Sequence, residues 1–284
     1  MQDNEGAVLF LGMVVAVIFA LLLEAVFPRR LESPNTNSRW VNNIGLTLVN
    51  QANVSWLTGV VAVGIAWWGE EERFGLLRDI DLSFWPLLLL AILVFEFIAY
   101  WFHRALHTVP WLWRIHAVHH SDTELDVTTT YRNHPLELLV NAPLTIPIIL
   151  LLGFPVAVVV AYQLIKTSVS VVAHSNIRLP SATDRFLRYL IVTPDYHRLH
   201  HCSERRFTDS NFCAAVPLFD YLFGTARTRP YADHATMELG LSYFRTPRDS
   251  RLDSLLLMPF VWKPRKVGKP IHQWESQATE ETRP

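Results

Sequence analysis

Hydrophobic residues are concentrated in four long runs along this chain, with polar stretches between them. The runs cover residues 7–27, 44–68, 84–102 and 138–173. A helix needs about 20 apolar residues to cross a bilayer, so each run is long enough to form a membrane span. No basic residues precede the first run and no small-residue cleavage site follows it, so we expect a retained span rather than a signal peptide. The pattern predicts an all-α integral membrane protein with about four spans.

The fourth run is too long for one span, and helix breakers divide it. Pro143 and Pro147 lie inside it, and a Gly-Phe-Pro sequence follows at residues 153–155. Proline and glycine end or kink helices. The run is therefore either one span or a hairpin that enters the membrane and returns to the side on which it began.

Charged residues between the runs predict how the spans are oriented. Arg29, Arg30 and Arg39 lie between the first two runs. The following loop is acidic, with Glu70, Glu71, Glu72, Asp79 and Asp81. Loops rich in Lys and Arg stay in the cytoplasm. The N-terminus is then expected outside, and the third run brings the residues that follow it to the cytoplasmic face.

Polar residues within the runs mark sides that face protein. Asn50, Gln51 and Asn53 lie in the second run, and Glu96 lies near the end of the third. Polar groups inside a membrane usually face the interior of a helix bundle. We therefore expect the second run to present one side to other helices.

Composition limits the classes of function. Half of the 284 residues are hydrophobic, 18% are charged and the mean hydropathy is +0.19, which is more apolar than most soluble enzymes. The net charge of −1 gives no reason to expect a nucleic-acid partner. Cys202 and Cys213 could pair, but we expect free buried thiols, and neither lies in a C-x-x-C zinc pattern. Any metal would be held by nitrogen and oxygen.

Eight of the twelve histidines fall into three clusters with helical spacing. Residues three and four positions apart lie on one face of a helix, so each cluster points several imidazoles in the same direction. Imidazole is the commonest protein ligand of transition metals. The clusters are His103 and His107, then His116, His119 and His120, and then His197, His200 and His201.

Two further histidines flank the fourth run. His134 precedes it and His174 follows it, so both are candidate metal ligands. For His134, a hydrogen bond to Glu137 or a role at a helix start is an equal alternative. His234 and His272 are isolated, and we leave them out of the candidate site.

The clusters favour metal binding over separate structural roles. A lone histidine near a span end is more simply a core or interfacial residue with a satisfied hydrogen bond. Eight clustered imidazoles would repel one another when protonated, and each would need its own partner. A single zinc ion takes three or four protein ligands, so eight to ten nitrogens predict two metal ions. All three clusters reach one side only if residues 138–173 form a hairpin, so we expect a cytoplasmic helical cap with a His-rich dimetal site.

Acidic residues near the clusters are candidates to orient the imidazoles. A carboxylate often accepts the second ring N–H of a ligating histidine. The same residues could instead be helix caps or solvated charges. The candidates are Asp122, Asp126, Glu137 and Asp195.

At these clusters the sequence resembles the sterol desaturase and fatty acid hydroxylase superfamily of integral membrane di-iron enzymes. The matching motifs are H-R-A-L-H at 103–107, H-A-V-H-H-S at 116–121, H-P-L-E at 134–137, H-S-N at 174–176 and T-P-D-Y-H-R-L-H-H at 193–201. D-S-N-F at 209–212 and F-D-Y-L-F-G-T at 219–225 also fit. We expect a catalytic domain at 84–230, between membrane spans at 1–83 and a cytoplasmic extension at 231–284.

The resemblance implies oxygen-dependent hydroxylation or desaturation of a C–H bond in a sterol, fatty acyl or related lipid. It implies two iron ions held by the eight clustered histidines together with His134 and His174, with dioxygen as co-substrate. It also implies a separate electron donor, namely a reductase and a small carrier protein. Zinc could replace iron in purified protein. A membrane metal transporter or metal-binding protein without oxygenase activity is the alternative, although the clusters lie outside the spans rather than along a pore.

Cys213 and Phe219 depart from the residues common in the superfamily, glycine and tryptophan, and bear on substrate fit rather than metal binding. No haem, flavin or nicotinamide-binding motif is present. Six arginines could form a docking face for an acidic carrier, or equally contact lipid phosphates. They are Arg104, Arg114, Arg132, Arg198, Arg205 and Arg206.

Overall fold

The computed structural model describes residues 2–31, 36–50 and 56–263, with the backbone alone for residues 2–5 and 56–60. Every regular element within these residues is a helix, which confirms the predicted all-α class. The helices are α1 (Gln2–Val26), α2 (Thr36–Asn50), α3 (Trp56–Glu71), α4 (Phe84–Thr108), α5 (Pro110–His120), η2 (Val127–Thr129), α6 (Pro135–Leu152), α7 (Val156–His174), α8 (Ser181–Leu187), α9 (Pro194–His200), α10 (Arg205–Thr208), α11 (Leu218–Leu222), η3 (Tyr231–Ala235) and α12 (Leu252–Leu257).

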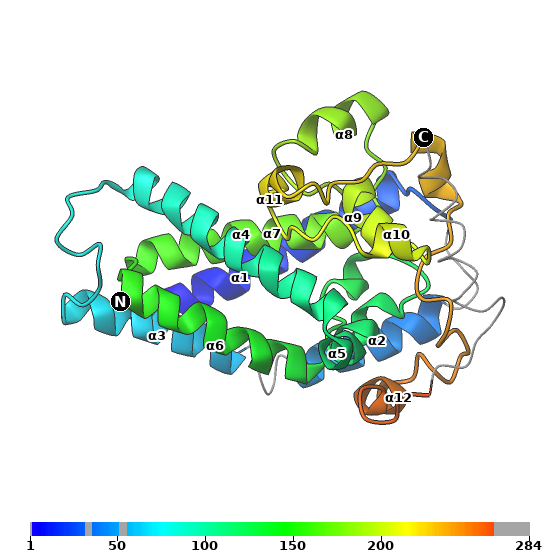
Figure 1. Cartoon of the computed structure of the whole chain (residues 1–284), viewed down its shortest axis with the longest axis horizontal. Helices are drawn as coiled ribbons and strands as arrows, with labels where there is room; N and C mark the ends of the chain where they lie inside the picture. Colours follow the sequence, from blue (N-terminus) through cyan, green and yellow to red (C-terminus); the bar gives the residue numbers. More distant parts are fainter. Residues whose placement is uncertain (1, 32–35, 51–55, 264–284) are drawn as a thin grey trace.

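The long helices run along the length of the molecule, and the short helices gather at one end as a cap (Figure 1). The N-terminus lies at the opposite end, so α1 leads toward the cap. Helix α7 lies at the centre and contacts α1, α3 and α4, while α6 packs on α3. Helices α1, α4 and α7 therefore each run from the far end of the bundle toward the cap.

Four helices are long and apolar enough to cross a membrane, which confirms the predicted number of spans. These segments are Gly6–Val26, Phe84–Thr108, Pro135–Leu152 and Val156–His174.

The described residues of the second hydrophobic run lie in α2 and α3, and neither helix is among the four candidate spans. Gln51 and Asn53 lie outside the described residues. Asn50, at the end of α2, is buried as expected and donates to the carbonyl of Asn133 at 2.6 Å. Helix α2 also buries Arg39 and Asn43, and such polar groups suit the cap better than a bilayer.

Residues 138–173 form the predicted hairpin. Pro143 and Pro147 lie inside α6 without ending it, whereas Gly153 caps the helix in a left-handed conformation with φ of 70°. Glycine adopts this conformation without the steric cost that a Cβ atom brings. Phe154 is fully buried in the turn and packs 5.5 Å from Phe95 on α4. The turn sends α7 back to the cap, where it ends at His174.

Two carboxylates inside apolar helices connect the bundle to the cap. Glu96 of α4 accepts from the Tyr162 hydroxyl at 3.0 Å and from the backbone N–H groups of Ala215 and Val216 at 2.9 and 3.1 Å. Glu24 of α1 accepts from the backbone N–H of Val127 at 3.0 Å and also from that of Asn176. Buried carboxylates are stabilised when they accept such bonds. Each acidic residue therefore fixes a cap segment to a span.

The hairpin turn yields a stability prediction for Gly153→Ala. A Cβ atom there would lie 2.6 Å from the Phe74 carbonyl oxygen and 2.9 Å from the Cα of Gly75. We expect the free energy of unfolding to fall by more than about 1 kcal/mol, because a left-handed alanine costs about 1–2 kcal/mol before the clash is counted. Denaturant unfolding in micelles measures the change.

Gly64→Ala on α3 is the matched control, because nothing lies within 4 Å of a Cβ atom built at Gly64. Alanine is also the better helix former, so this variant should be as stable as the parent or slightly more so. Equal stability of the two variants would contradict the role assigned to Gly153.

Candidate metal centre

Nine histidines converge into two neighbouring groups in the cap. Within each group, the potential ligand atoms all lie within 4.8 Å of one another. Eight of the nine are buried, and His103 is half-buried. Group A comprises His103, His107, His116, His120 and His200, and group B comprises His119, His174, His197 and His201.

Helix ends bring these side chains together. Helix α4 continues past the apolar span and carries His103 and His107 one turn apart, as predicted. Helices α5 and α9 both begin with a proline at the first helical position, Pro110 and Pro194, where the missing N–H costs nothing. Their short lengths place the H-x-x-H-H motifs at the helix C-termini, and His174 is the last residue of α7.

Each H-x-x-H-H motif contributes to both groups. On α5, His116 and His120 belong to group A, while His119 belongs to group B. On α9 the assignment is reversed, because the residues four apart, His197 and His201, belong to group B and His200 belongs to group A. The rings of His120 and His201 stack at 4.5 Å where the groups meet. The two groups therefore share their supporting helices.

Acceptors at Nδ1 fix the tautomers of four imidazoles. His103 and His200 meet the carbonyl oxygens of Phe212 and Ser210 at 2.7 and 2.6 Å. In group B, Nδ1 of His174 lies 2.8 Å from the Ser170 carbonyl oxygen. A carbonyl oxygen only accepts, so Nδ1 carries the proton in each case and Nε2 keeps its lone pair. His116 is held in the same way by the Glu137 carboxylate at 3.0 Å, the orienting role predicted for Glu137.

The lone pairs of group A point at one another. Nε2 of His103 lies 3.0 Å from Nε2 of His116 and 3.1 Å from Nε2 of His200. A neutral ring that carries its proton on Nδ1 presents a lone pair at Nε2, and one cation placed between these atoms would accept several of them together. Two nitrogens at 2.0–2.1 Å from one metal ion are themselves about 3 Å apart. The donor set therefore fits a bound metal ion.

Other Nε2 atoms of the two groups either lack a hydrogen-bond partner among the described residues or face another imidazole nitrogen. Nε2 of His107 is buried with no hydrogen-bond partner among the described residues, while its Nδ1 lies 3.3 Å from Asp209. In group B, Nε2 of His174 lies 3.1 Å from that of His119 and 2.9 Å from that of His197. The convergence of Nε2 atoms thus recurs in the second group.

Burial keeps the imidazoles of the cap neutral. Loss of solvation, together with the neighbouring imidazole of His116, lowers the pKa of His200 to about 3. Burial, and after it the other imidazoles, also lower the pKa values of His119, His120, His197 and His201 well below the ordinary range. Neutral imidazole is the form that binds metals, so the site is prepared for them across the physiological pH range.

One loop supplies three of the acceptors, through the carbonyls of Ser210 and Phe212 and the carboxylate of Asp209. Asp220 holds this loop by accepting from the backbone N–H groups of Phe212 and Cys213 at 2.8 and 2.9 Å. The D-S-N-F and F-D-Y motifs therefore position imidazoles through backbone groups, a role that their letters alone do not reveal.

His134 is not brought to either group. Its Nδ1 accepts from the backbone N–H of Leu136 at 3.2 Å, and its Nε2 donates to the carbonyl of Leu256 at 3.1 Å. It is the N-cap residue of α6, which is the helix-start role left open above. The hydrogen bond to Glu137 considered for it is instead made by His116. The two cysteines are buried free thiols, as predicted, and belong to neither group.

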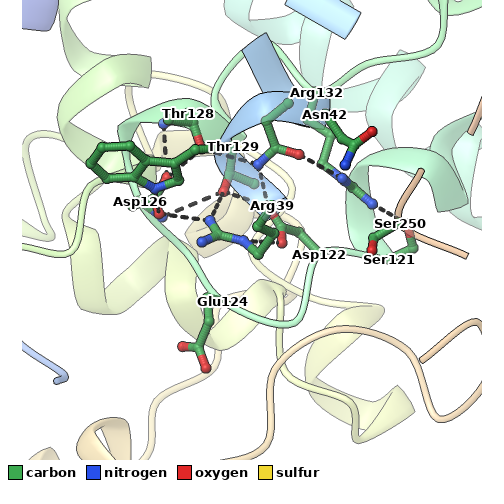
Figure 2. Close-up of polar contacts among 12 residues, drawn as sticks. Arg39, Asn42, Ser121, Asp122, Glu124, Asp126, Thr128, Thr129, Arg132 and Ser250 are labelled. Atoms are coloured by element: carbon green, nitrogen blue, oxygen red, sulfur yellow. Dashed lines mark hydrogen bonds and ion pairs between the residues drawn. The ribbon is translucent and has the colours of Figure 1, made fainter. Parts of the chain in front are cut away.

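Figure 2 shows a buried polar network behind the first H-x-x-H-H motif. Arg39 of α2 lies between Asp122 and Asp126 and bonds both carboxylates. Arg132 is fully buried and donates to the Val118 carbonyl at 3.0 Å and to the Ser121 hydroxyl at 2.9 Å. Because Ser121 and Asp122 directly follow His120, this network fixes the end of α5. Asp122 and Asp126 thus bind Arg39 rather than an imidazole.

A second buried arginine supports the other motif. Arg198, between His197 and His200, donates to the carbonyl of Ser175 at 3.0 Å and pairs with Asp195. Asp195 also pairs with Arg29 at 3.2 Å and lies 3.9 Å from Nδ1 of His234, so it serves arginines and an isolated histidine rather than an imidazole of group A or B.

The burial of Arg132 and Arg198 corrects the predicted docking face. Both side chains are fully inaccessible and cannot meet a carrier protein or a lipid phosphate. Arg205 and Arg206 do lie on the surface, where they pair with Asp209 and Glu204.

The fold and the histidine groups together define a helical membrane protein with a His-rich metal site in a cap. The sequence model of the fatty acid hydroxylase family matches residues 88–225, a range that contains both groups. With the motifs above, this match confirms the resemblance to the sterol desaturase and fatty acid hydroxylase superfamily over just under half of the chain.

Characterised relatives include lipid-modifying enzymes. The chain is 30% identical to an ornithine lipid hydroxylase of Rhizobium tropici over 149 residues, which are 51% of this chain and 44% of that protein. It is 33% identical to the very-long-chain aldehyde decarbonylase GL1-11 of Oryza sativa over 158 residues, 53% of this chain and 58% of the relative. For the decarbonylase GL1-2 of the same species the identity is 35% over 182 residues, 61% of this chain and 27% of the relative. The matches thus cover less than two thirds of each relative. No solved structure matches the chain significantly.

The group assignment predicts different metal contents for two histidine variants. We expect His174→Ala to lower the number of metal ions bound per chain, because it removes one of the four donors of group B. His134→Ala should keep the full metal content, because it removes a helix cap instead. Elemental analysis of purified protein measures both. The assignment would be contradicted if His134→Ala lost metal while His174→Ala kept its full metal content.

The buried network predicts a stability change for Arg39→Met. This substitution leaves Asp122 and Asp126 without their cation, and breaking a buried pair costs about 3–5 kcal/mol. Denaturant unfolding in micelles should show a loss of this size. Arg73→Met is the control, because Arg73 and Asp79 form an exposed pair and the stability should hardly change. Similar small losses for both variants would show that the network does not hold the cap together.

Proposed function

We propose that this protein is a membrane lipid oxygenase, which hydroxylates or desaturates a C–H bond of a lipid at a centre of two iron ions. One observation carries the proposal: nine imidazoles, eight of them buried, converge in the cap at the end of the four apolar helices. The match to the fatty acid hydroxylase model and the lipid-modifying relatives support the same class of reaction.

The donor set suits redox-active metals. Nitrogen-only ligation fits iron, copper, zinc or nickel, and iron matches the family. Two bound iron ions would supply the activation of dioxygen, the co-substrate. Zinc binds nitrogen sites more tightly than ferrous iron, so purified protein can contain zinc. The proposed ligands are the nine histidines of groups A and B, without His134.

The chain's own residues orient and shield the metal site. The Nδ1 acceptors set the tautomer and orientation of individual rings before any metal arrives. The rings of Phe212 and Trp113 lie 5.2 and 5.0 Å from that of His107 and cover one side of group A. Such apolar walls limit the access of water, which protects a C–H oxidation from side reactions.

The position of the site indicates the substrate class. Groups A and B lie at the ends of α4 and α7, so a substrate that resides in the bilayer can approach along the bundle. The basic residues that follow the first span support a cap on the cytoplasmic face. Electrons would come from a reductase and a small carrier protein on that side. Metal transport is less well supported, because both groups lie in a closed cap rather than along the spans.

Lipid analysis tests the proposed function. Cells that produce the protein should contain a lipid with one added oxygen or two fewer hydrogens than the corresponding lipid in cells producing His120→Ala. His134→Ala should behave like the parent. A hydrocarbon one carbon shorter than a long-chain aldehyde would instead indicate decarbonylation, the activity named for the rice relatives.

Purified protein gives the decisive form of the experiment. Iron-loaded protein should consume oxygen with a reductant and an extract of its own membrane lipids, and the product should carry the mass change. An iron-loaded protein that forms no lipid product with any lipid class under these conditions would contradict the proposal.

A further inference from the structure

Trp113 packs directly against group A. It lies on α5, one turn before His116 and two turns before His120, and its ring is 5.0 Å from that of His107 and 5.5 Å from that of His120. The side chain is half-buried, so one side faces the imidazoles while the other faces the C-terminal part of the cap.

A continuous series of aromatic side chains leads from Trp113 to the surface. The Trp113 indole N–H donates to the Tyr243 hydroxyl oxygen at 3.0 Å. The Tyr243 ring lies 5.9 Å from that of Trp262, and the exposed Arg114 places its guanidinium 5.8 Å above Trp262. Lys263, the next residue, is exposed. The series therefore joins group A to the outside through three rings and one hydrogen bond.

These three residues share a chemical property. Tryptophan and tyrosine are the aromatic side chains that most readily lose and regain one electron. A second aromatic path from group A begins at Phe212, which contacts His103, His107 and His200 and then Tyr100 at 6.1 Å. Phenylalanine is much harder to oxidise, so this second path is interrupted at its first ring. Of these two paths among the described residues, the one through Trp113 consists of oxidisable residues throughout.

We propose that Trp113, Tyr243 and Trp262 form an electron-transfer chain between group A and the protein surface. The proposal rests on the proposed function, in that a redox-active metal must occupy group A. It goes further by naming the route and the face at which a one-electron carrier delivers electrons.

The electron balance is simple. A metal centre that is the stronger oxidant takes one electron from Trp113, Tyr243 replaces it, and Trp262 in turn replaces the electron of Tyr243. A reduced one-electron carrier at the surface then reduces Trp262. One electron has passed from the carrier to the metal, and each ring has returned to its closed-shell state with its proton in place. The same route removes oxidising equivalents when no substrate is bound, which protects the imidazoles.

A photochemical experiment on the full-length protein tests the chain. Lys263→Cys offers a surface thiol for a ruthenium photosensitiser, because Cys202 and Cys213 are both buried. A flash with an oxidative quencher then generates a strong one-electron oxidant beside Trp262. In anaerobic protein loaded with ferrous iron, we expect the flash to oxidise the iron. The change in absorbance of the iron centre measures this oxidation.

Variants in the labelled background separate the chain from general packing. Trp113→Phe and Tyr243→Phe should lose the photochemical oxidation of iron, and Trp113→Tyr should restore it. Trp111→Phe is the matched control, since Trp111 lies two residues earlier on α5 and is 55% exposed, and it should behave like the parent. Tyr243→Phe keeps the test decisive if Trp113→Phe loses iron, because Tyr243 does not contact an imidazole.

Equal oxidation of iron in the parent, Trp113→Phe and Tyr243→Phe, at equal iron content, would overturn the proposal. The measurement uses neither oxygen nor lipid. A protein that modifies no lipid can therefore still show the electron-transfer chain, and one that does modify lipid can still lack it. The two proposals are thereby tested separately.

Discussion

Hydrogen bonds to the Nδ1 atoms of the imidazoles are the interactions on which the site depends. Because carbonyl and carboxylate acceptors hold the Nδ1 protons, the Nε2 lone pairs must face inward and meet one another. A cation bound among them would accept these lone pairs together, so the arrangement is suited to metal binding. The remaining structure keeps these acceptors in place: Asp220 fixes the loop of Ser210 and Phe212, and Glu96 fixes the segment that follows it. The apolar bundle provides the support for the cap.

The sequence was sufficient to predict the elements that follow from local periodicity. The first and third apolar runs each predicted one span, and the Gly-Phe-Pro sequence in the fourth run predicted the hairpin turn at Gly153 that divides it into two. Spacing of three and four residues predicted that the imidazoles of each cluster share a helix face. Requiring that all clusters meet then linked the hairpin to the site. These predictions depend on residues that are close to one another in the sequence.

What the sequence did not reveal depends on contacts between distant segments. Helical spacing gives the face of a helix but not its partner, so the division of each motif between two groups could not be foreseen. The apolar residues around α2 concealed its polar side, which pairs Arg39 with Asp122 from another segment. Arg132 and Arg198 seemed suited to the surface because arginine is rarely buried, yet each satisfies carbonyl oxygens inside the cap. His134 shares its residue type with the ligands, but its backbone position made it a helix cap.

The division of each H-x-x-H-H motif between the two groups has a thermodynamic consequence. An ion bound in group A would immobilise α5 and α9, and these helices also present His119, His197 and His201 to group B. Much of the entropic cost of ordering the group B ligands would then precede the binding of the second ion. Coupling of this kind is reciprocal, so each ion raises the affinity for the other. Loading is therefore expected to be cooperative, with a sparse population of chains that hold a single ion.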